Sequence, residues 1–583
     1  MSSDFSGEQK RYLEGFAAGI GAGMLAGKAP VAPAGPAGPD AIHTAAQDSV
    51  TAGGGKLADQ EKWKRAEHPF DAYARFKAQS RRNEAPKPED NFRWRYYGLF
   101  YVAPTQTSYM CRLRIPNGIL RHWQFAGVAD IAERHGGPYV HVTTRANLQL
   151  REIAPSSGAA VVEAVENLGL STRGSGADNI RNVTGGATAG IDGQEIADTR
   201  QLASDWHKHI LNDRSLYGLP RKFNVAFDGG GIIATLEETN DIGFQAVQLR
   251  AKDNGDKQLM WRVTLGGITG HKDLARATGL FCTSEDCITV ADAIVRVFIS
   301  HGTRTDRTKA RLKYLLDAWG FERFLGEVET LLDRKLTRLS ESDLLPRPPI
   351  DRQAHIGVRA QKQAGLNWIG VHCPVGKLSV DQVRGLAMLA KRYGDGDIRL
   401  TVWQNLLMSG VRDGDVEAVI AGLGALGLSA SASTLASGLV ACTGKTGCKF
   451  AAAYTKEDAV RIAASLDQKL VLDQPVNIHV TGCHHSCAQH YIGDIGLVGA
   501  PVPVNDEGDT IEGYDIIVGG GFADQARIGR LLWPKVPAGK AAGHVERLLR
   551  AWQAHRTSPD ESFHAFTHRV DDETLKALAG GAS

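Results

Sequence analysis

The sequence predicts an α+β fold arranged as a tandem duplication with pseudo-twofold symmetry. Three observations support this prediction. The 583 residues exceed what one hydrophobic core holds, so two to four domains are expected. One stretch of the chain recurs further along it, and each copy reads as a strand, a helix and a strand.

The repeat is found by adding 258 to a residue number, and no gap is needed. The pairs are Pro116 and Pro374, Gly118 and Gly376, Gly136 and Gly394, Thr143 and Thr401, Asn147 and Asn405, and Leu148 and Leu406. Between these marks, Phe125, Val128 and Ile131 fall on Val383, Leu386 and Leu389. That spacing predicts two copies of one amphipathic helix, and the β-branched YVHVTT after the first predicts a strand.

A second segment recurs with an offset of 255, which maps Pro220 and Val225 onto Pro475 and Val480. A period this long is unlike a solenoid repeat and indicates an ancient fusion of two modules. Symmetric halves leave a cleft between them, and the copies can diverge. The clustered cysteines lie in the second copy, and the matching region of the first copy is cationic.

Residues 1–90 are interpreted as an N-terminal extension and linker. A short amphipathic helix is expected near the start, from the spacing of Phe5, Tyr12, Leu13, Phe16, Ile20 and Met24. The run APVAPAGPAGPD at 29–40 is typical of a linker, and ordered structure is expected to restart near Trp63.

Composition excludes several classes. Hydrophobic residues make up 43% and charged residues 23%, which argues against global disorder, and a net charge of +2 gives no general affinity for nucleic acid. No run of eighteen apolar residues exists, so no membrane span is expected. Eight cysteines, four of them in one region, suit a reducing compartment, and we expect a cytoplasmic protein.

Four cysteines form the main candidate site. ACTGKTGCKF contains Cys442 and Cys448, and TGCHHSCAQH contains Cys483 and Cys487. Four thiols on two turns can enclose one metal or hold the corners of an iron–sulfur cluster. Paired zinc ligands usually stand two residues apart, so zinc is disfavoured but stays open, as do inert buried thiols.

The other cysteines and a histidine pair are assigned no chemistry. Cys282, Cys287, Cys111 and Cys373 are interpreted as packing residues. His484 and His485 are interpreted as solvent-facing or bonded to backbone rather than as metal ligands.

At CTGKTGC and GCHHSCAQHYIGDIGLVG the sequence resembles the sirohaem and [4Fe–4S] nitrite and sulfite reductases. The resemblance runs from about 90 to 528 through FRWRYYGLF, RLRIPNG, HVTTRANLQL, DNIRN, LPRKFN and TDRTKARLKYLLDAWG in the family's order. It implies ferredoxin-like half-domains at 91–175 and 346–430. It also implies two sirohaem/Fe–S α+β domains at 176–345 and 431–583.

The resemblance also implies the cofactors and the residues that hold them. A [4Fe–4S] cluster is expected on Cys442, Cys448, Cys483 and Cys487, with Cys487 also the axial ligand of sirohaem. Family matching places Arg112, Arg181, Lys222 and Asn224 at the substrate. It places Arg145, Gln149 and Arg311 on the carboxylates of the sirohaem. Arg114, Arg151 and Lys309 are interpreted as solvated surface charges.

Two features favour nitrite over sulfite as substrate. Asn224 stands where similar sulfite reductases carry a second lysine, and a pocket with one fewer positive charge favours the monoanion nitrite over a dianion. Some sulfite reductases also link a tyrosine to a cysteine beside the haem. This chain has Phe100 and Gly176 at those positions, so that crosslink cannot form.

The electron donor is expected to be a separate protein. No G-x-G-x-x-G stands between a strand and a helix, and VGGGF at 518–522 is interpreted as a turn. The resemblance implies reduced ferredoxin, which would suit the basic runs at 62–65 and 80–87. A monomer is expected. A sulfite reductase of the same fold and a zinc-stabilised scaffold protein remain the alternatives.

Overall fold

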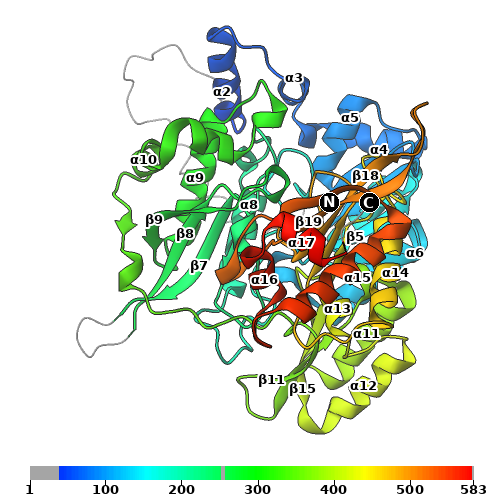
Figure 1. Cartoon of the computed structure of the whole chain (residues 1–583). Coiled ribbons are helices and arrows are strands. Elements are labelled where there is room, and N and C mark those ends of the chain that lie inside the picture. Colours follow the sequence, from blue (N-terminus) through cyan, green and yellow to red (C-terminus); the bar gives the residue numbers. More distant parts are fainter. Residues whose placement is uncertain (1–37, 251–256, 581–583) are drawn as a thin grey trace, which may run out of the picture.

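Four five-stranded sheets with helices packed on them form the α+β fold that the sequence predicts (Figure 1). The structure is a computed structural model that describes residues 38–250 and 257–580. The expected helix between Phe5 and Met24 lies outside these residues. Within them, no helix combines the length and the apolar character that crossing a bilayer requires.

The two ferredoxin-like copies exchange a strand. The first sheet has the order β1 (Leu99–Val102), β2 (Ser108–Arg112), β5 (Leu148–Ile153), β4 (Tyr139–Val142) and β13 (Lys377–Ser379). The second has the order β11 (Gly357–Ala360), β12 (Leu366–Val371), β15 (Leu406–Arg412), β14 (Asp397–Leu400) and β3 (Ile119–Arg121). Each sheet therefore takes its last strand from the other copy, which locks the copies together.

The predicted repeat is confirmed in the helices. α6 (His122–His135) and α11 (Val380–Tyr393) have bounds that differ by the predicted 258, and so do α7 (Gly158–Asn167) and α12 (Val416–Ala425). Phe125 and Val128 of α6 are buried in one continuous core with Val383 and Leu386 of α11. The two half-domains thus share a single hydrophobic core.

Two glycines directly precede the exchanged strands, where the chain crosses from one half-domain to the other. Gly118 and its counterpart Gly376 both have positive φ, at 70° and 68°. A Cβ on Gly118 would lie 2.8 Å from the Leu400 carbonyl oxygen, and one on Gly376 would lie 2.5 Å from that of Val142. Only glycine fits both the backbone conformation and this close approach.

The two larger α+β modules each contain one further sheet. The first has the order β10 (Thr337–Arg338), β9 (Arg276–Cys282), β8 (Leu259–Leu265), β7 (Ile242–Gln248) and β6 (Val225–Asp228). The second has the order β16 (Leu439–Ala441), β17 (Ile478–Thr481), β18 (Ile495–Pro503), β19 (Thr510–Val518) and β20 (Arg530–Pro537). Each has its own core.

Helices cover these modules. In the first they are α8 (Arg200–Asn212), α9 (Cys287–His301) and α10 (Leu312–Leu332). In the second they are α13 (Thr434–Ser437), α14 (Thr455–Asp467), α15 (Ala538–His555), α16 (Phe563–Arg569) and α17 (Asp572–Leu578). Figure 1 shows α9 and α10 beside β7–β9, and α14 and α15 beside the orange strands of the second module.

The predicted offset of 255 between these modules is wrong by two residues. β6 runs parallel to β7 with Val225 opposite Ile242, and β17 runs parallel to β18 with Ile478 opposite Ile495. Val225 therefore corresponds to Ile478, an offset of 253. A shift of two residues keeps every side chain on the same face of a strand, so the hydrophobic pattern alone cannot detect it.

The N-terminal segment is part of the fold well before Trp63, which corrects the prediction. It forms α2 (Ala41–Ala52), α3 (Asp59–Ala66), α4 (Tyr73–Arg81) and α5 (Pro88–Trp94). Figure 1 shows α2 and α3, in blue, beside the first α+β module. Several of the side chains buried here are polar, including His43, Gln47, Glu61 and Lys64, so a search for apolar periodicity passes over them.

Candidate functional site

The two cysteine pairs follow neighbouring parallel strands. Cys442 comes directly after β16, and Cys483 comes two residues after the end of β17, with Ala441 opposite Val480. The carboxyl ends of parallel strands meet at one edge of a sheet, so the pairs are brought together there. The Gly482 amide donates to Cys442 Sγ at 3.2 Å, which shows how close the two turns are.

The four thiols influence one another electrostatically. Burial raises the pKa of the Cys483 thiol to about 12, and the thiols of Cys487, Cys448 and Cys442 act in the same direction. Cys487 reaches solvent, yet surrounding protein desolvates it and raises the pKa of its thiol. The Cys487 thiol is thus partly accessible to solvent and largely surrounded by protein.

The thiol spacing does not fit one zinc ion. A tetrahedral zinc site with Zn–S bonds of 2.3 Å brings its sulfurs to about 3.8 Å from one another. In the described part of the chain, two groups of three potential ligands have ligand atoms within 4.8 Å of one another, and neither contains a cysteine. No three of the four thiols therefore lie as close together as one zinc ion needs, which favours a larger guest such as a [4Fe–4S] cluster.

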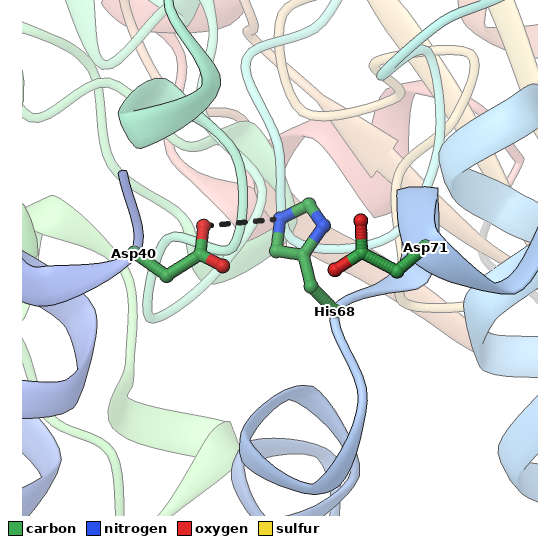
Figure 2. A group of neighbouring side chains, drawn as sticks. All are labelled: Asp40, His68 and Asp71. Carbon is green, nitrogen blue, oxygen red and sulfur yellow. Dashed lines mark ion pairs between the residues drawn. The ribbon is translucent and has the colours of Figure 1, made fainter. Parts of the chain in front are cut away.

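Those two compact groups are already occupied by arginine. Figure 2 shows His68 between Asp40 and Asp71. The Arg214 guanidinium forms ion pairs with both carboxylates, at 2.8 and 2.7 Å. Arg296 pairs in the same way with both carboxylates of the group formed by His209, Asp213 and Asp292. A guanidinium already neutralises each pair, so neither group is a candidate metal site.

The first copy holds the cysteine turns of the second. Thr144, in the turn between β4 and β5, donates to the Cys487 carbonyl oxygen at 2.9 Å. Arg151 on β5 donates to Thr443 Oγ1 at 2.6 Å and to the Gly447 carbonyl oxygen at 3.1 Å. The site is therefore assembled at the interface between the copies.

The residues expected to bind substrate and cofactor come from several elements of the first copy. Arg112 ends β2 and stands opposite Gln149 of β5, and Arg145 lies in the turn before β5. Arg181 follows the 176–180 segment, Lys222 and Asn224 precede β6, and Arg311 directly precedes α10. Electrostatic coupling links Cys487 to Lys222 and Arg112, and Arg112 to Arg145 and Arg181.

Burial lowers the pKa of the cationic groups of the candidate site. Burial lowers the pKa of Arg112 and of Arg145 to about 10 each, and nearby cations add to the effect. Burial, with Arg311 as the next cause, lowers the pKa of Lys222 to about 7, and Cys487 opposes that shift. The pKa of Arg181 is lowered well below its usual value, first by burial and then by Arg112.

Four of these cations lack a carboxylate partner. Among the described residues, no Asp or Glu oxygen lies within 4 Å of Arg112, Arg145, Arg181 or Lys222, and Arg181 Nε is buried without a hydrogen bond. Enclosed charges are normally paired in folded proteins. The donor set therefore fits an anionic guest that carries several carboxylates, together with a small anion.

Family comparisons match both kinds of module. The family described as "Nitrite and sulphite reductase 4Fe-4S domain" matches residues 176–336 and 437–566, and the "Nitrite/Sulfite reductase ferredoxin-like half domain" matches 101–168 and 359–426. The chain belongs to the nitrite and sulfite reductase family.

Individual relatives within the family are ferredoxin–nitrite reductases. The enzyme of Synechococcus elongatus is 36% identical over 476 residues, which cover 80% of this chain and 90% of that protein. The chloroplastic enzyme of Zea mays is 33% identical, and the alignment covers 79% of this chain and 82% of that protein. The solved structure of the Mycobacterium tuberculosis NirA protein has a TM-score of 0.81 at 27% sequence identity. The match covers 89% of this chain and 98% of that protein.

The residues that correspond to Arg145 and Gln149 in the second copy are apolar and buried. Trp403 stands where Arg145 stands in the first copy, and Leu407 stands where Gln149 does. Trp403 is 2% exposed and packs against Phe522, with ring centroids 4.7 Å apart. An aromatic side chain fills the second copy where the first presents a cation.

Two arginines that we interpret from the sequence as surface charges are buried, which corrects that interpretation. Arg114 is 1% exposed and donates to the Ile180 carbonyl oxygen at 2.6 Å. Arg151 is 5% exposed and binds the Cys442–Cys448 turn. Arg151 shares a strand face with Gln149, two residues away, and this period-two signal could have revealed it. Lys309 is exposed, as predicted.

Phe100 and Gly176, which stand at the positions of the tyrosine–cysteine crosslink of some sulfite reductases, are neighbours in space. A Cβ on Gly176 would lie 2.7 Å from Phe100 Cζ, and the Arg112 guanidinium lies 4.8 Å from the centroid of the Phe100 ring. Phe100 therefore forms part of the site wall. The remaining cysteines behave as packing residues: Cys111, Cys282, Cys287 and Cys373 are buried.

Sequence reasoning misses three polar side chains that support the site. Asp241 accepts from the Asn224 amide at 2.8 Å and from Arg311 at 2.7 Å. Asn240 accepts from Arg145 at 2.8 Å. Asp178 of DNIRN is completely buried and pairs with Arg307. Their partners are distant in sequence, so no local pattern reveals them.

Proposed function

We propose that this chain reduces nitrite to ammonium with six electrons from reduced ferredoxin, at a sirohaem coupled to a [4Fe–4S] cluster. The proposal rests on a group of cations without carboxylate partners that interact electrostatically with Cys487, where the two copies meet. The family and the names of its members support the same reaction.

Cys442, Cys448, Cys483 and Cys487 would hold the cluster, with Cys487 also bound to the sirohaem iron. When bound, these cofactors supply the sites that store electrons and pass them to the anion. Arg145, Gln149 and Arg311 would face the carboxylates of the sirohaem. Arginine suits this role because its planar donors match a carboxylate with two hydrogen bonds.

Arg112, Arg181 and Lys222 would orient the substrate anion and donate to its oxygens. The Arg181 guanidinium is held on its own segment by the Ser175 and Ala177 carbonyl oxygens, so its position is fixed before an anion arrives. Preorganised donors of this kind stabilise charge as it develops on departing oxygens. The Lys222 ammonium can also supply a proton.

Asn224 favours nitrite over sulfite in this proposal. Its backbone amide is held by Asp241, and its side-chain oxygen, with the amide turned toward Arg145, accepts from Arg145 Nη2 at 3.0 Å. An amide here adds no positive charge to the pocket. The lower-charged anion is then the better match.

Ferredoxin would dock over the turn that carries Cys448. Lys445, Lys449 and Phe450 are exposed around this turn, and Lys445 pairs with Glu512 at 2.8 Å, whereas no ion pair is recorded for Lys449 among the described residues. The basic run at 62–65 is a weaker candidate, because Lys64 is buried and Lys62 and Arg65 form ion pairs with Asp59 and Asp48. A negatively charged donor protein would be steered by such lysines in a salt-dependent way.

The proposal also covers context and organisation. We place the enzyme in nitrate assimilation in the cytoplasm, acting as a monomer. We divide the chain into an extension at 1–90, half-domains at 91–175 and 346–430, and cofactor domains at 176–345 and 431–583.

The test is an anaerobic assay of the holoenzyme with reduced ferredoxin and either nitrite or sulfite. We expect stoichiometric ammonium from nitrite, much slower reduction of sulfite, and a rate with ferredoxin that falls as salt is added. Faster sulfide formation from sulfite would replace this proposal with the sulfite reductase alternative.

A further inference from the structure

Lys64 of the N-terminal helix α3 reaches into the wall of the candidate site. Its side chain is 6% exposed, and its Nζ donates to the carbonyl oxygens of Gly218 and Leu219 at 3.1 and 2.9 Å. These two residues lead directly into Pro220, Arg221 and Lys222. The backbone that presents Lys222 is therefore fastened to a helix more than 150 residues away in sequence.

The same ammonium also faces the segment that presents Arg181. Lys64 Nζ lies 3.6 Å from Asp178 Oδ2, and the Asp178 side chain is fully buried. Arg307 binds both oxygens of Asp178 at 2.7 Å, and Arg221 lies 3.7 Å from it. Asp178 stands three residues before Arg181 and directly after Ala177, whose carbonyl oxygen holds the Arg181 guanidinium together with that of Ser175.

Backbone hydrogen bonds join these two segments beside Lys64. The Arg181 amide donates to the Phe223 carbonyl oxygen at 2.8 Å, and the Phe223 amide donates to that of Asn179 at 3.0 Å. Asn179 Oδ1 also accepts from the Gly218 amide at 3.0 Å. A movement of either segment at Lys64 is thus transmitted to the spacing between Arg181 and Lys222.

The charge of Lys64 is balanced locally. Glu61, one helical turn earlier, is 1% exposed, forms an ion pair with Lys64 and accepts from Arg304 at 2.5 Å. Lys62, two residues before Lys64, faces solvent and pairs with Asp59. One helix thus carries a buried lysine in contact with the site wall and an exposed lysine that serves as its control.

We propose that Lys64 is a positioning residue that sets the spacing of Arg181 and Lys222, and through them the affinity of the site for its anion. The inference rests on the proposed function, because it assigns the anion to this pair of cations. It makes the N-terminal segment part of the anion site rather than an appendage.

Three variants test the proposal in the holoenzyme. Lys64→Arg keeps the charge but changes the length and the donor geometry. Lys64→Met removes the anchor and leaves Glu61 paired with Arg304 and Asp178 paired with Arg307, so no buried carboxylate loses its only partner. Lys62→Met is the matched surface control.

The readouts are titrations of the optical spectrum with nitrite, with sulfite and with carbon monoxide. Carbon monoxide is uncharged and needs the haem iron but no cations. Loss of correctly placed charged donors should raise the anion dissociation constant about tenfold or more in both Lys64 variants. Carbon monoxide binding and cofactor content of both Lys64 variants should match the wild-type protein, and so should every property of Lys62→Met.

Two results would overturn the inference. Wild-type anion affinity in both Lys64 variants would show that the anchor does not set the spacing. Equal loss of anion and carbon monoxide binding would show that Lys64 only supports folding. A wild-type protein that binds sulfite but not nitrite would instead refute the proposed substrate, and the anchor would then be judged on sulfite. Binding of neither anion would refute both.

Discussion

Lys222 is the cation of the site whose charge depends most on pH. Burial and the neighbouring Arg311 disfavour its ammonium form and lower its pKa to about 7, although Cys487 favours the charged form. Below this pKa the group is charged, and above it the group becomes neutral. Its contribution to anion binding is therefore present at low pH and declines as pH rises through neutrality.

The first prediction follows from this charge. Nitrite affinity of the wild-type holoenzyme should fall as pH rises through about 7. Lys222→Met should weaken binding and lower kcat by roughly 100-fold, because a charged donor to the reacting anion is lost. It should also remove the pH dependence across this range.

The measurement is nitrite titration of wild-type and Lys222→Met protein at several pH values, with Lys309→Met as an exposed control. Unchanged turnover in Lys222→Met would refute the role assigned to this residue.

Candidate site residues could be proposed from the sequence where they belong to a local motif or to the two-residue period of a strand. The four cysteines and the cations of HVTTRANLQL and LPRKFN follow from local sequence and a family resemblance. Arg151 and Arg114 were not recognised, because burial of a charge depends on partners that are distant in sequence. Arg151 finds Thr443 and Gly447 nearly 300 residues away.

At the scale of elements, β5 holds the turn between Cys442 and Cys448 through one side chain. Arg151→Ala removes two hydrogen bonds from a charged donor, which together contribute about 3 kcal/mol or more to holding the turn. We expect iron to be lost to a chelator several times faster than from wild-type protein. Arg134→Ala, an exposed arginine on α6, is the control.

Iron content after timed exposure to the chelator is the measurement. Equal rates of loss in the wild type and Arg151→Ala would mean that the turn is held without this contact.

The crossing of the two copies gives a prediction about stability. Gly118→Ala forces an L-residue to a φ of 70° and places a Cβ 2.8 Å from Ala146 Cβ and from the Leu400 carbonyl oxygen. Strain and overpacking together should cost roughly 2–4 kcal/mol and lower Tm by several degrees. Gly414→Ala has no neighbour within 4 Å and should leave Tm nearly unchanged.

Thermal unfolding of the holoenzymes measures the difference. If Gly118→Ala and Gly414→Ala had the same Tm, the crossing would not require glycine.

The elements of the duplication were predictable and their exchange was not. A hydrophobic period identifies α6 and α11 with bounds that repeat at the predicted offset. The hydrophobic pattern does not reveal which sheet β3 and β13 join. Both are short strands, and their alternating side chains would fit beside the edge strand of either sheet. The offset of the second segment failed for a related reason, since strands repeat every two residues.

At the scale of the whole molecule, the proposed function gives the two copies one shared site within the described residues. The first copy supplies the cations and the second supplies the thiols, while Trp403 and Phe522 fill the counterpart in the second copy. The N-terminal segment adds a third contributor through Lys64. The tandem arrangement was evident from sequence, but the contribution of the N-terminal helices was not, because their buried contacts are largely polar.

We propose that the chain holds one sirohaem coupled to one [4Fe–4S] cluster and binds nitrite. The most direct measurement is the optical spectrum of anaerobically purified protein, with analysis of iron, sulfide, zinc and extractable tetrapyrrole, before and after nitrite is added. We expect one tetrapyrrole per chain, cluster iron and sulfide, and a spectral shift with nitrite. A colourless protein that contains zinc and no tetrapyrrole would contradict it.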